Sequence, residues 1–290
     1  MEQQPAGTPV PRTHRTLWWK EALLFGAFYA VYTWTRNQFG SDRLGDVEAP
    51  VHAFTNAMRV IRFERWIGLF HEESVQEIFL PYRSFIQLLN TYYGTAHFII
   101  TIAVFILLYK KRPDVFPQWR NTLAATTALA IVGFSLFPLM PPRLLDQPCP
   151  KDGGYGAVCL DAPERGVESG KDNFGFVDTL DQYGGPWDFS SGAAAKVSNQ
   201  YAAMPSLHIG WASWCAFAMW PLARRRWVRA AVLLYPAITL MCIIVTANHY
   251  WIDGVGGQLT LAVGFGIGTM IHRLNQRRLD RKHDQELLIS

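Results

Sequence analysis

Long stretches without any charged residue constrain this chain most. Charged side chains are absent from 131 of its 290 residues in six long gaps, at 22–35, 84–109, 121–142, 197–223, 230–252 and 254–272. A helix needs about 20 apolar residues to cross a hydrocarbon core roughly 30 Å thick, so most of these gaps have the length of a membrane span. The chain is also only 17% charged, against about 25% in an average soluble domain. The sequence therefore predicts an all-α integral membrane protein and excludes an ordinary soluble domain.

The gaps predict six transmembrane helices, at about 17–36, 84–109, 120–138, 204–223, 229–247 and 253–272. Residues 1–16 are polar and lack apolar periodicity, which predicts a disordered tail. No small-residue cleavage site follows the first apolar stretch, so we expect that stretch to be retained as the first span. A membrane domain over residues 17–273 then lies between this tail and a basic tail at 274–290.

The basic residues predict the orientation of the spans. With both termini in the cytoplasm, 16 of the 27 Lys and Arg residues fall in the short cytoplasmic segments, as the positive-inside rule requires. Of the 23 Asp and Glu residues, 16 fall in the long connections 37–83 and 139–203, which this topology places outside the cytoplasmic membrane. Because topology accounts for the surplus of basic residues, we expect membrane lipids and not nucleic acid as partners.

The two long outer connections differ in pattern. Residues 55–82 alternate apolar and charged residues at roughly helical spacing, which predicts helices that either lie in the membrane interface or cap the bundle. Residues 139–203 contain many Gly and Pro residues and form a predicted outer loop, whose length is typical of functional loops. Within it, Cys149 and Cys159 are predicted to form a disulfide, whereas Cys215 and Cys242 are interpreted as small apolar residues of the spans.

Two histidines lie at the predicted outer ends of spans. His208 begins the fourth span and His249 ends the fifth, so both lie at one membrane face. Asp253 follows His249 by four residues, which on a continuous helix puts the two on one face. Such an aspartate can accept the proton of one imidazole nitrogen and leave the other free to attack a phosphoryl group, while a second histidine protonates the leaving oxygen. A single interfacial histidine is usually a polar anchor, but two on one face with a carboxylate favour catalysis.

The segments around these histidines are MPSLH at 204–208 and NHYWID at 248–253. They resemble the second and third signature motifs of the type 2 phosphatidic acid phosphatase superfamily, most closely its inositol phosphorylceramide synthase-like branch. Three further segments resemble bacterial members of that branch: FPLMPPR at 137–143, ERWIGLFHEESVQ at 64–76 and FVDTL at 176–180. The resemblance covers most of residues 55–273 and implies the core bundle of six transmembrane helices known for this superfamily.

The resemblance implies a role for each matched residue. His249 would be the nucleophile that forms a phosphohistidine, Asp253 its orienting partner and His208 the acid that protonates the departing alcohol. Phosphate oxygens would be bound by Ser206, Asn248 and Arg143, the last as a cationic clamp. The phosphatase branch has Ser-Arg seven and six residues before the third-motif histidine, where this chain has Cys242 and Ile243. A phosphate-binding cation is thus missing from its usual place, which favours the transferase-like branch or a site that uses Lys196 or another cation of the outer loop.

These observations together predict an enzyme that acts on a lipid phosphate at the extracytoplasmic face. Water as acceptor would make it a phosphatase, and an alcohol such as a sugar or polyol would make it a head-group transferase for an inositol or sugar phosphate. Neither reaction requires a metal or another cofactor. The alternatives are a polyprenyl phosphate or pyrophosphate phosphatase, a transporter, and a catalytically inactive assembly protein. We interpret His97 as a packing residue and the Gly264–Gly268 pair as a site of close helix packing.

Overall fold

The computed structural model describes residues 48–146, 174–184 and 200–289, together with residues 17–19, 21, 23, 26, 27 and 30. The predictions for Lys196, for the Cys149–Cys159 disulfide, for the first tail and for most of the first span lie outside the described residues. The described part is helical, apart from turns and one isolated bridge between Leu139 and Ala202. This agrees with the predicted all-α class.

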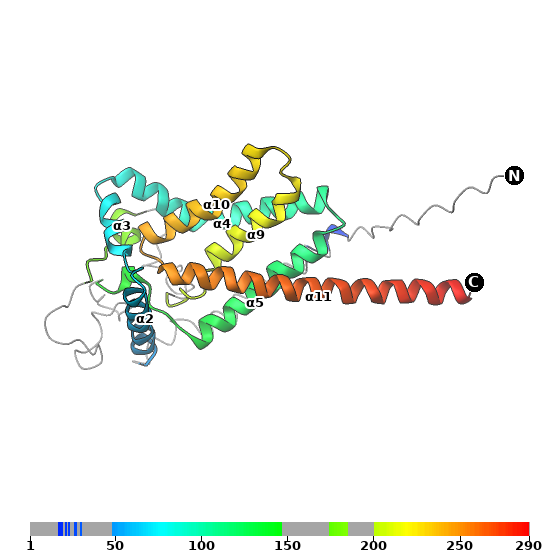
Figure 1. Cartoon of the computed structure of the whole chain (residues 1–290), viewed down its shortest axis with the longest axis horizontal. Helices are drawn as coiled ribbons and strands as arrows, with labels where there is room; N and C mark the ends of the chain where they lie inside the picture. Colours follow the sequence, from blue (N-terminus) through cyan, green and yellow to red (C-terminus); the bar gives the residue numbers. More distant parts are fainter. Residues whose placement is uncertain are drawn as a thin grey trace.

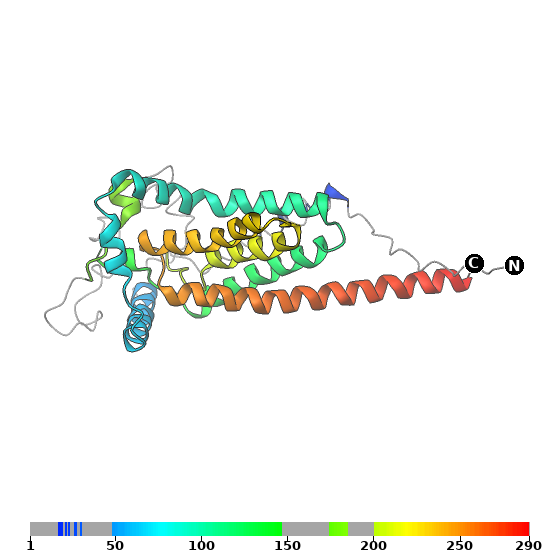
Figure 2. The same ribbon diagram turned by 45° about the horizontal axis from the view of Figure 1, so that its top comes forward.

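Five of the described helices run along the length of the molecule and form a bundle (Figures 1 and 2). They are α4 (Arg83–Lys111), α5 (Phe116–Leu136), α9 (Leu207–Met219), α10 (Arg226–Val245) and α11 (Trp251–Ile289). Each lies where one of the second to sixth spans was predicted. Among the described residues, α4, α10 and α11 are long and apolar enough to cross a membrane. The structure thus has the character of a membrane protein, while the number of six spans stays a prediction.

Two of the bundle helices differ in length from the predicted spans. Helix α9 has only 13 residues and continues as the short 3-10 helix η4 (Trp220–Leu222). Helix α11 has 39 residues, because it continues through the segment predicted as a separate basic tail. Figure 2 shows this C-terminal part of α11 extending beyond the other helices. The change to polar residues does not end the helix, because the Arg, Lys and Gln residues of this segment favour helical backbone, as its Leu residues do.

Helices α5 and α11 pack closely through glycines. A Cβ atom added to Gly264 would lie 2.9 Å from the backbone nitrogen of Thr126, and one added to Gly268 would lie 2.6 Å from that of Thr122. Since backbone atoms cannot move aside as a flexible side chain can, only glycine fits at these two positions. The interpretation of this glycine pair as a site of close helix packing is confirmed.

One end of the bundle is covered by short elements, and we call it the site end. Helices α5 and α10 end there, and α9 and α11 begin there. The short elements at this end, on the left in Figure 2, are α2 (Glu48–Trp66), α3 (Glu72–Phe79), α7 (Thr179–Tyr183) and the 3-10 helix η2 (Pro142–Leu144). Helix α2 buries Phe54, Ala57 and Ile61 against core residues of the 139–145 segment, such as Met140. The prediction of helices in 55–82 agrees with α2 and α3, although α2 begins earlier than predicted, and both helices lie at the site end of the bundle.

The described parts of the predicted outer loop are packed into the site end. Leu139, Met140, Leu144 and Tyr201 are all at most 3% exposed. Backbone hydrogen bonds tie them to other elements: Leu139 N donates to Tyr201 O (2.8 Å) and Met140 N donates to Ala53 O (3.2 Å). These segments therefore form part of the packed core around the predicted site residues.

Candidate active site

The loop between α10 and α11 carries His249 into the centre of the site end. The ring is almost fully buried, at 3% exposure. Its Nδ1 lies 3.2 Å from Oδ2 of Asp253, and its Nε2 lies 3.4 Å from Oγ of Ser206. A carboxylate on Nδ1 fixes the proton there, so that Nε2 carries the lone pair. The structure thus brings together the predicted histidine and aspartate, although His249 lies in the loop before α11 and not on a continuous helix, and it leaves Nε2 facing Ser206.

The backbone of this loop is held in an uncommon conformation. Ala247 has a positive φ of 52°, which costs a non-glycine residue about 1 kcal/mol or more. The carbonyl of Ala247 accepts a hydrogen bond from Arg143 N at 2.8 Å, and the amides of Asn248 and His249 both donate to Ile243 O (3.0 and 3.3 Å). These bonds keep the turn in place, so His249 is presented by a fixed backbone.

His208 lies in the first turn of α9, beside His249. The centres of the two imidazole rings are 5.6 Å apart. The residue before α9, Ser206, donates its backbone N–H to the carbonyl of Asp253 at 3.0 Å, which ties the start of α9 to the start of α11. Nε2 of His208 is buried and has no hydrogen-bond partner within the described part of the chain. Such an atom is suited to exchange a proton with a bound substrate.

Two aromatic residues of α4 fix the ring of His208 from the other side. Tyr93 stacks on it with ring centres 4.4 Å apart and planes 21° apart. His97 contacts it at 4.5 Å, in an edge-on arrangement, and its own Nδ1 bonds to Tyr93 O at 3.0 Å. His97 therefore packs, as we interpreted it, but it packs directly against a candidate catalytic side chain.

Arg143 is buried at the site end and already bound to three protein side chains. Its guanidinium donates to Asp178 Oδ2 at 2.7 Å, to Asn248 Oδ1 at 3.0 Å and, through a short contact, to Gln200 Oε1. Among the described residues it is the one buried Lys or Arg side chain. The predicted phosphate clamp thus lies beside the His249 loop, but the carboxylate of Asp178 offsets its charge.

Asn248, another predicted phosphate ligand, is also occupied by the protein. Its amide nitrogen donates to Thr246 Oγ1 at 2.9 Å and its oxygen accepts from Arg143. Ser206, the third predicted ligand, is fully buried and faces Nε2 of His249. In the part of the chain that the structure describes, no group of three or more His, Cys, Asp or Glu side chains could hold a metal ion.

Two glutamates that we did not predict as site residues lie behind His249. Glu64 and Glu72 are both 0% exposed, and they accept the backbone N–H groups of Ile252 (2.8 Å) and Trp251 (3.2 Å). The signal was present in the sequence, because Glu64 follows the apolar Ile61 by three residues and so falls on the buried face of α2. A charge on that face requires a specific partner.

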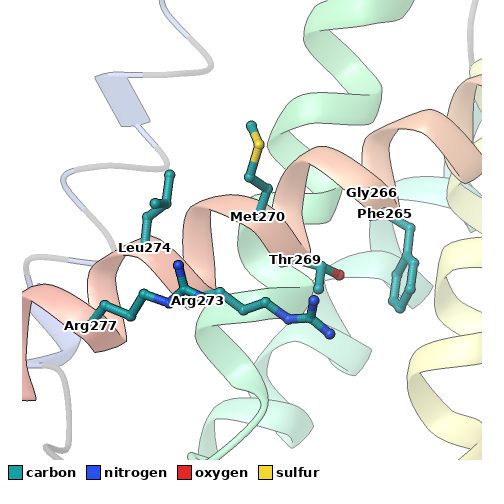
Figure 3. Close-up of a pocket in the computed structure, with 7 residues that line it drawn as sticks. All are labelled: Phe265, Gly266, Thr269, Met270, Arg273, Leu274 and Arg277. Carbon is teal, nitrogen blue, oxygen red and sulfur yellow. The ribbon is translucent and has the colours of Figure 1, made fainter.

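The pocket drawn in Figure 3 is separate from these residues. It has a volume of about 370 Å³, and its seven lining residues, from Phe265 to Arg277, all belong to α11. Phe265 lies 12 residues beyond Asp253, which corresponds to about 18 Å along a helix. The pocket therefore plays no part in the arrangement around His249.

A sequence model of the PAP2 superfamily, that of the type 2 phosphatidic acid phosphatases, matches residues 58–267. The chain belongs to the PAP2 superfamily. Neither a curated protein nor a solved structure matches it with significance. The match contains Arg143, His208, His249 and Asp253, so the side chains that meet at the site end all lie inside the PAP2 region.

Membership of the PAP2 superfamily supports a phosphatase or phosphotransferase activity on a phosphate substrate. The local geometry is consistent with that chemistry. A buried imidazole with its Nε2 facing a serine hydroxyl, a carboxylate on its Nδ1 and a second imidazole beside it can pass a phosphoryl group.

Proposed function

We propose that this PAP2 protein is a membrane enzyme that takes a phosphoryl group from a lipid phosphate through a phosphohistidine intermediate. The observation that carries the proposal is the position of His249, held between Asp253 and Ser206 with the ring of His208 at 5.6 Å. The site lies at one end of helices with the length and hydropathy of membrane spans. A substrate with its phosphate at the membrane surface and its chains between helices suits this placement.

The reaction takes two steps. Nε2 of His249 attacks phosphorus, the N–P bond forms, and the P–O bond to the departing alcohol breaks while protonated His208 gives its proton to the departing oxygen. In a phosphodiester donor the departing alcohol is the head group, so the lipid-bearing phosphoryl group stays on His249 until the acceptor takes it. Asp253 stabilises the positive charge on the imidazole during the attack. Water or a second alcohol then attacks phosphorus, loses its proton to His208, and releases His249. Donors near the phosphate, including Ser206 Oγ, stabilise the charge on its oxygens.

The charges around His249 support head-group transfer over hydrolysis of a simple phosphomonoester. A monoester carries close to two negative charges, whereas a phosphodiester such as an inositol or sugar phospholipid carries one. Among the described residues the one buried cation is Arg143, and Asp178 already neutralises it. Such a site suits a singly charged diester better than the more highly charged polyprenyl phosphates and pyrophosphates. We therefore propose a phosphodiester lipid as donor and a sugar, polyol or other alcohol as acceptor.

The orientation of the site is part of the proposal. Exposed arginines gather at the end of the bundle opposite His249, at positions 224–226, 273 and 277. Positive residues favour the cytoplasmic side. This supports an extracytoplasmic site in the cell membrane with both termini in the cytoplasm.

The test is turnover by the purified full-length protein in lipid nanodiscs. A panel of phosphomonoester, phosphodiester and polyprenyl phosphate lipids is supplied with and without alcohol acceptors, and free phosphate and new lipid are measured separately. We expect a new lipid from a phosphodiester donor, loss of that product in His249→Ala, and no loss in the control His52→Ala, an exposed histidine of α2.

Each other outcome identifies a rival function. Free phosphate without new lipid would indicate a phosphatase, and turnover retained by His249→Ala would refute the phosphohistidine mechanism. Movement of intact substrate across the bilayer without any product would indicate a transporter. Binding without product or movement would indicate an inactive assembly protein.

A further inference from the structure

Three consecutive amide groups at the start of α11 are each bound by a different carboxyl group. Tyr250 N donates to Asp253 Oδ2 at 3.0 Å, Trp251 N to Glu72 and Ile252 N to Glu64. The first N–H groups of a helix lack partners within the helix, and its positive end favours negative charge. Two of the three partners come from α2 and α3. The start of α11 is therefore anchored to the helices that cap the bundle.

Helix α3 also binds the other side of the His249 loop. Gln76 Nε2 donates to Val245 O, at the end of α10, at 3.2 Å and to Val177 O at 2.9 Å. Its Oε1 accepts the amide of Val177 at 2.9 Å. Since His249 lies between Val245 and Trp251, α3 binds both ends of the backbone that carries it. The position of the imidazole thus depends on α3.

The two glutamates form a buried carboxyl pair. Both are fully buried, their Oε1 atoms accept the N–H groups of the consecutive residues Trp251 and Ile252, and among the described residues no Lys or Arg binds either one. Each has a second, buried carboxyl oxygen, Oε2, that has no hydrogen-bond partner in the described part of the chain. Two buried carboxylates this close repel each other when both are ionised. One proton shared between Glu64 and Glu72 removes the repulsion and satisfies both groups.

The titration of Glu64 agrees with a shared proton. Burial first, and then the neighbouring Glu72, raise the pKa of Glu64 to about 9, and Asp253 adds to the rise. The N–H of Ile252 acts in the opposite direction. Burial and the same carboxyl groups also raise the pKa of Tyr250. Glu64 therefore retains its proton at neutral pH and loses it in alkaline solution.

We propose that Glu64 and Glu72 are positioning residues that share one proton and together fix the start of α11, and with it the His249–Asp253 pair. They act through α11 and do not touch the reacting atoms. This gives a physical role to the ERWIGLFHEESVQ segment, in which Glu64, Glu72 and Gln76 all bind backbone near His249. The tests of this role that measure turnover rest on the function proposed above, whereas the spectroscopic test does not.

The first test compares alanine with glutamine at both positions. Glu64→Ala and Glu72→Ala remove an anchor of α11, and we expect kcat to fall about 10²-fold with little change in KM, because a misplacement near 1 Å has that effect. In Glu64→Gln the amide oxygen still accepts from Ile252 and the NH₂ group replaces the shared proton. Glutamine should therefore rescue most of the loss. Glu77→Ala, exposed on the same short helix, is the matched control and should leave kcat unchanged.

The pH profile separates positioning from simple packing. Wild-type kcat should fall as pH rises through about 9, where the pair loses its proton, and Glu64→Gln should lack this alkaline decrease. The free energy of unfolding should also decrease as pH rises. A carboxyl whose folded pKa lies above its unfolded value stabilises the fold at low pH and loses that contribution as pH rises through the folded pKa. The Tm of wild type relative to Glu64→Gln should therefore decrease from pH 5 to pH 9.

The structural readout needs no substrate. Infrared spectroscopy of the protein in nanodiscs should show the C=O stretch of a protonated carboxyl at pH 7, which disappears above about pH 9 and in Glu64→Gln. Loss of this band with no lipid turnover in any variant would support the pair while refuting the proposed function. Absence of the band in wild type, or an equal loss of kcat in Glu64→Gln and Glu64→Ala, would overturn the pair.

Discussion

The two ends of the helix bundle differ in how they hold most of their charged residues. At the site end, charged side chains are buried and held by specific hydrogen bonds: Glu64, Glu72, Arg143, Asp178 and Asp253. At the opposite end the arginines at 224–226, 273 and 277 are exposed and the Arg112–Asp114 ion pair is partly exposed, whereas Glu21 is buried and paired with Arg120. A buried charge costs several kcal/mol unless it is paired, whereas an exposed charge costs almost nothing.

This difference in burial indicates which charged residues belong to the candidate active site. The exposed arginines can orient the chain in a membrane without a specific partner. The buried charges are each bound in one geometry, and most of those bonds lead to the loop or helix that carries His249. We therefore expect substitutions at the site end to affect turnover or stability strongly, and substitutions at the opposite end to have little effect.

The largest effect is expected for Asp253→Asn. The variant lacks the charge that stabilises the imidazole of His249 and loses the defined acceptor for Nδ1 and for Tyr250 N. Turnover should fall by about 10³- to 10⁴-fold, as for the aspartate of other histidine-based sites. Single-turnover measurement of the phosphoryl-transfer step checks this. A decrease below about 10-fold would argue against His249 as the nucleophile, because a nucleophilic imidazole depends on this partner.

The next effect is on stability, at Arg143 and Asp178. Asp178→Asn leaves the buried guanidinium of Arg143 without its counter-charge, which typically costs about 3–5 kcal/mol. The asparagine oxygen can still accept the backbone N–H groups at the start of α7, as the N-cap aspartate does. Thermal unfolding in detergent measures the loss. The double variant Arg143→Met, Asp178→Asn contains no unpaired charge and should recover most of it.

The same double variant tests the phosphate clamp. If Arg143 binds the substrate phosphate, the double variant will be stable but will have a raised KM and lowered kcat. If Arg143 only supports the loop around Asn248, turnover will recover together with stability. The second result would remove Arg143 from the substrate-binding residues.

A smaller effect is expected where helices approach each other at the site end. A Cβ atom on Gly257 would lie 2.3 Å from the carbonyl oxygen of Ser206. Gly257→Ala must therefore push the start of α9 away from α11, at a cost of about 1–3 kcal/mol, and should lower turnover by shifting His208. Gly266→Ala on the same helix meets nothing within 4 Å and is the control. Equal behaviour of the two variants would contradict close packing at the site.

The smallest effect is expected for Asp114→Ala at the opposite end. Its hydrogen bonds with Arg112 lower the pKa of Asp114, so the contribution of this pair is present at neutral pH and is lost as pH falls through that lowered value. For an exposed pair this contribution is about 0–1 kcal/mol. Tm and turnover should both stay near wild type at pH 7. A large loss would show that the two ends differ less than their burial indicates.

The helices and the central pair could be predicted from the sequence. Apolar stretches gave the positions of α4, α5, α9, α10 and α11, because a helix that contacts lipid must satisfy its own backbone and remain apolar. The spacing of His249 and Asp253 gave their contact but not its geometry, because His249 lies in the loop before α11 and reaches back to Asp253 in the first turn of that helix. The family resemblance brought His208 and Ser206 to the same site, where the structure places them.

The partners of the buried charges could not be predicted in this way. Arg143 and Asp178 are 35 residues apart and lie in segments without periodicity. Glu64 and Ile252 are 188 residues apart. Their contacts depend on how α2, α3 and the 139–145 segment close over the bundle, which no local pattern encodes. The length of α11 was also underestimated, because a change from apolar to basic residues ends a span but does not end a helix.

By itself, the sequence determined that this chain is helical, carries spans of membrane character and places two histidines at one end of them. These properties follow from hydropathy and helical spacing, which act over neighbouring residues. Only the tertiary structure decided that Arg143 is neutralised by Asp178, that His97 and Tyr93 fix His208, and that Glu64 and Glu72 hold the start of α11. These are contacts between distant segments, and burial gives them their energy, because a charge removed from water must find its partner within the fold.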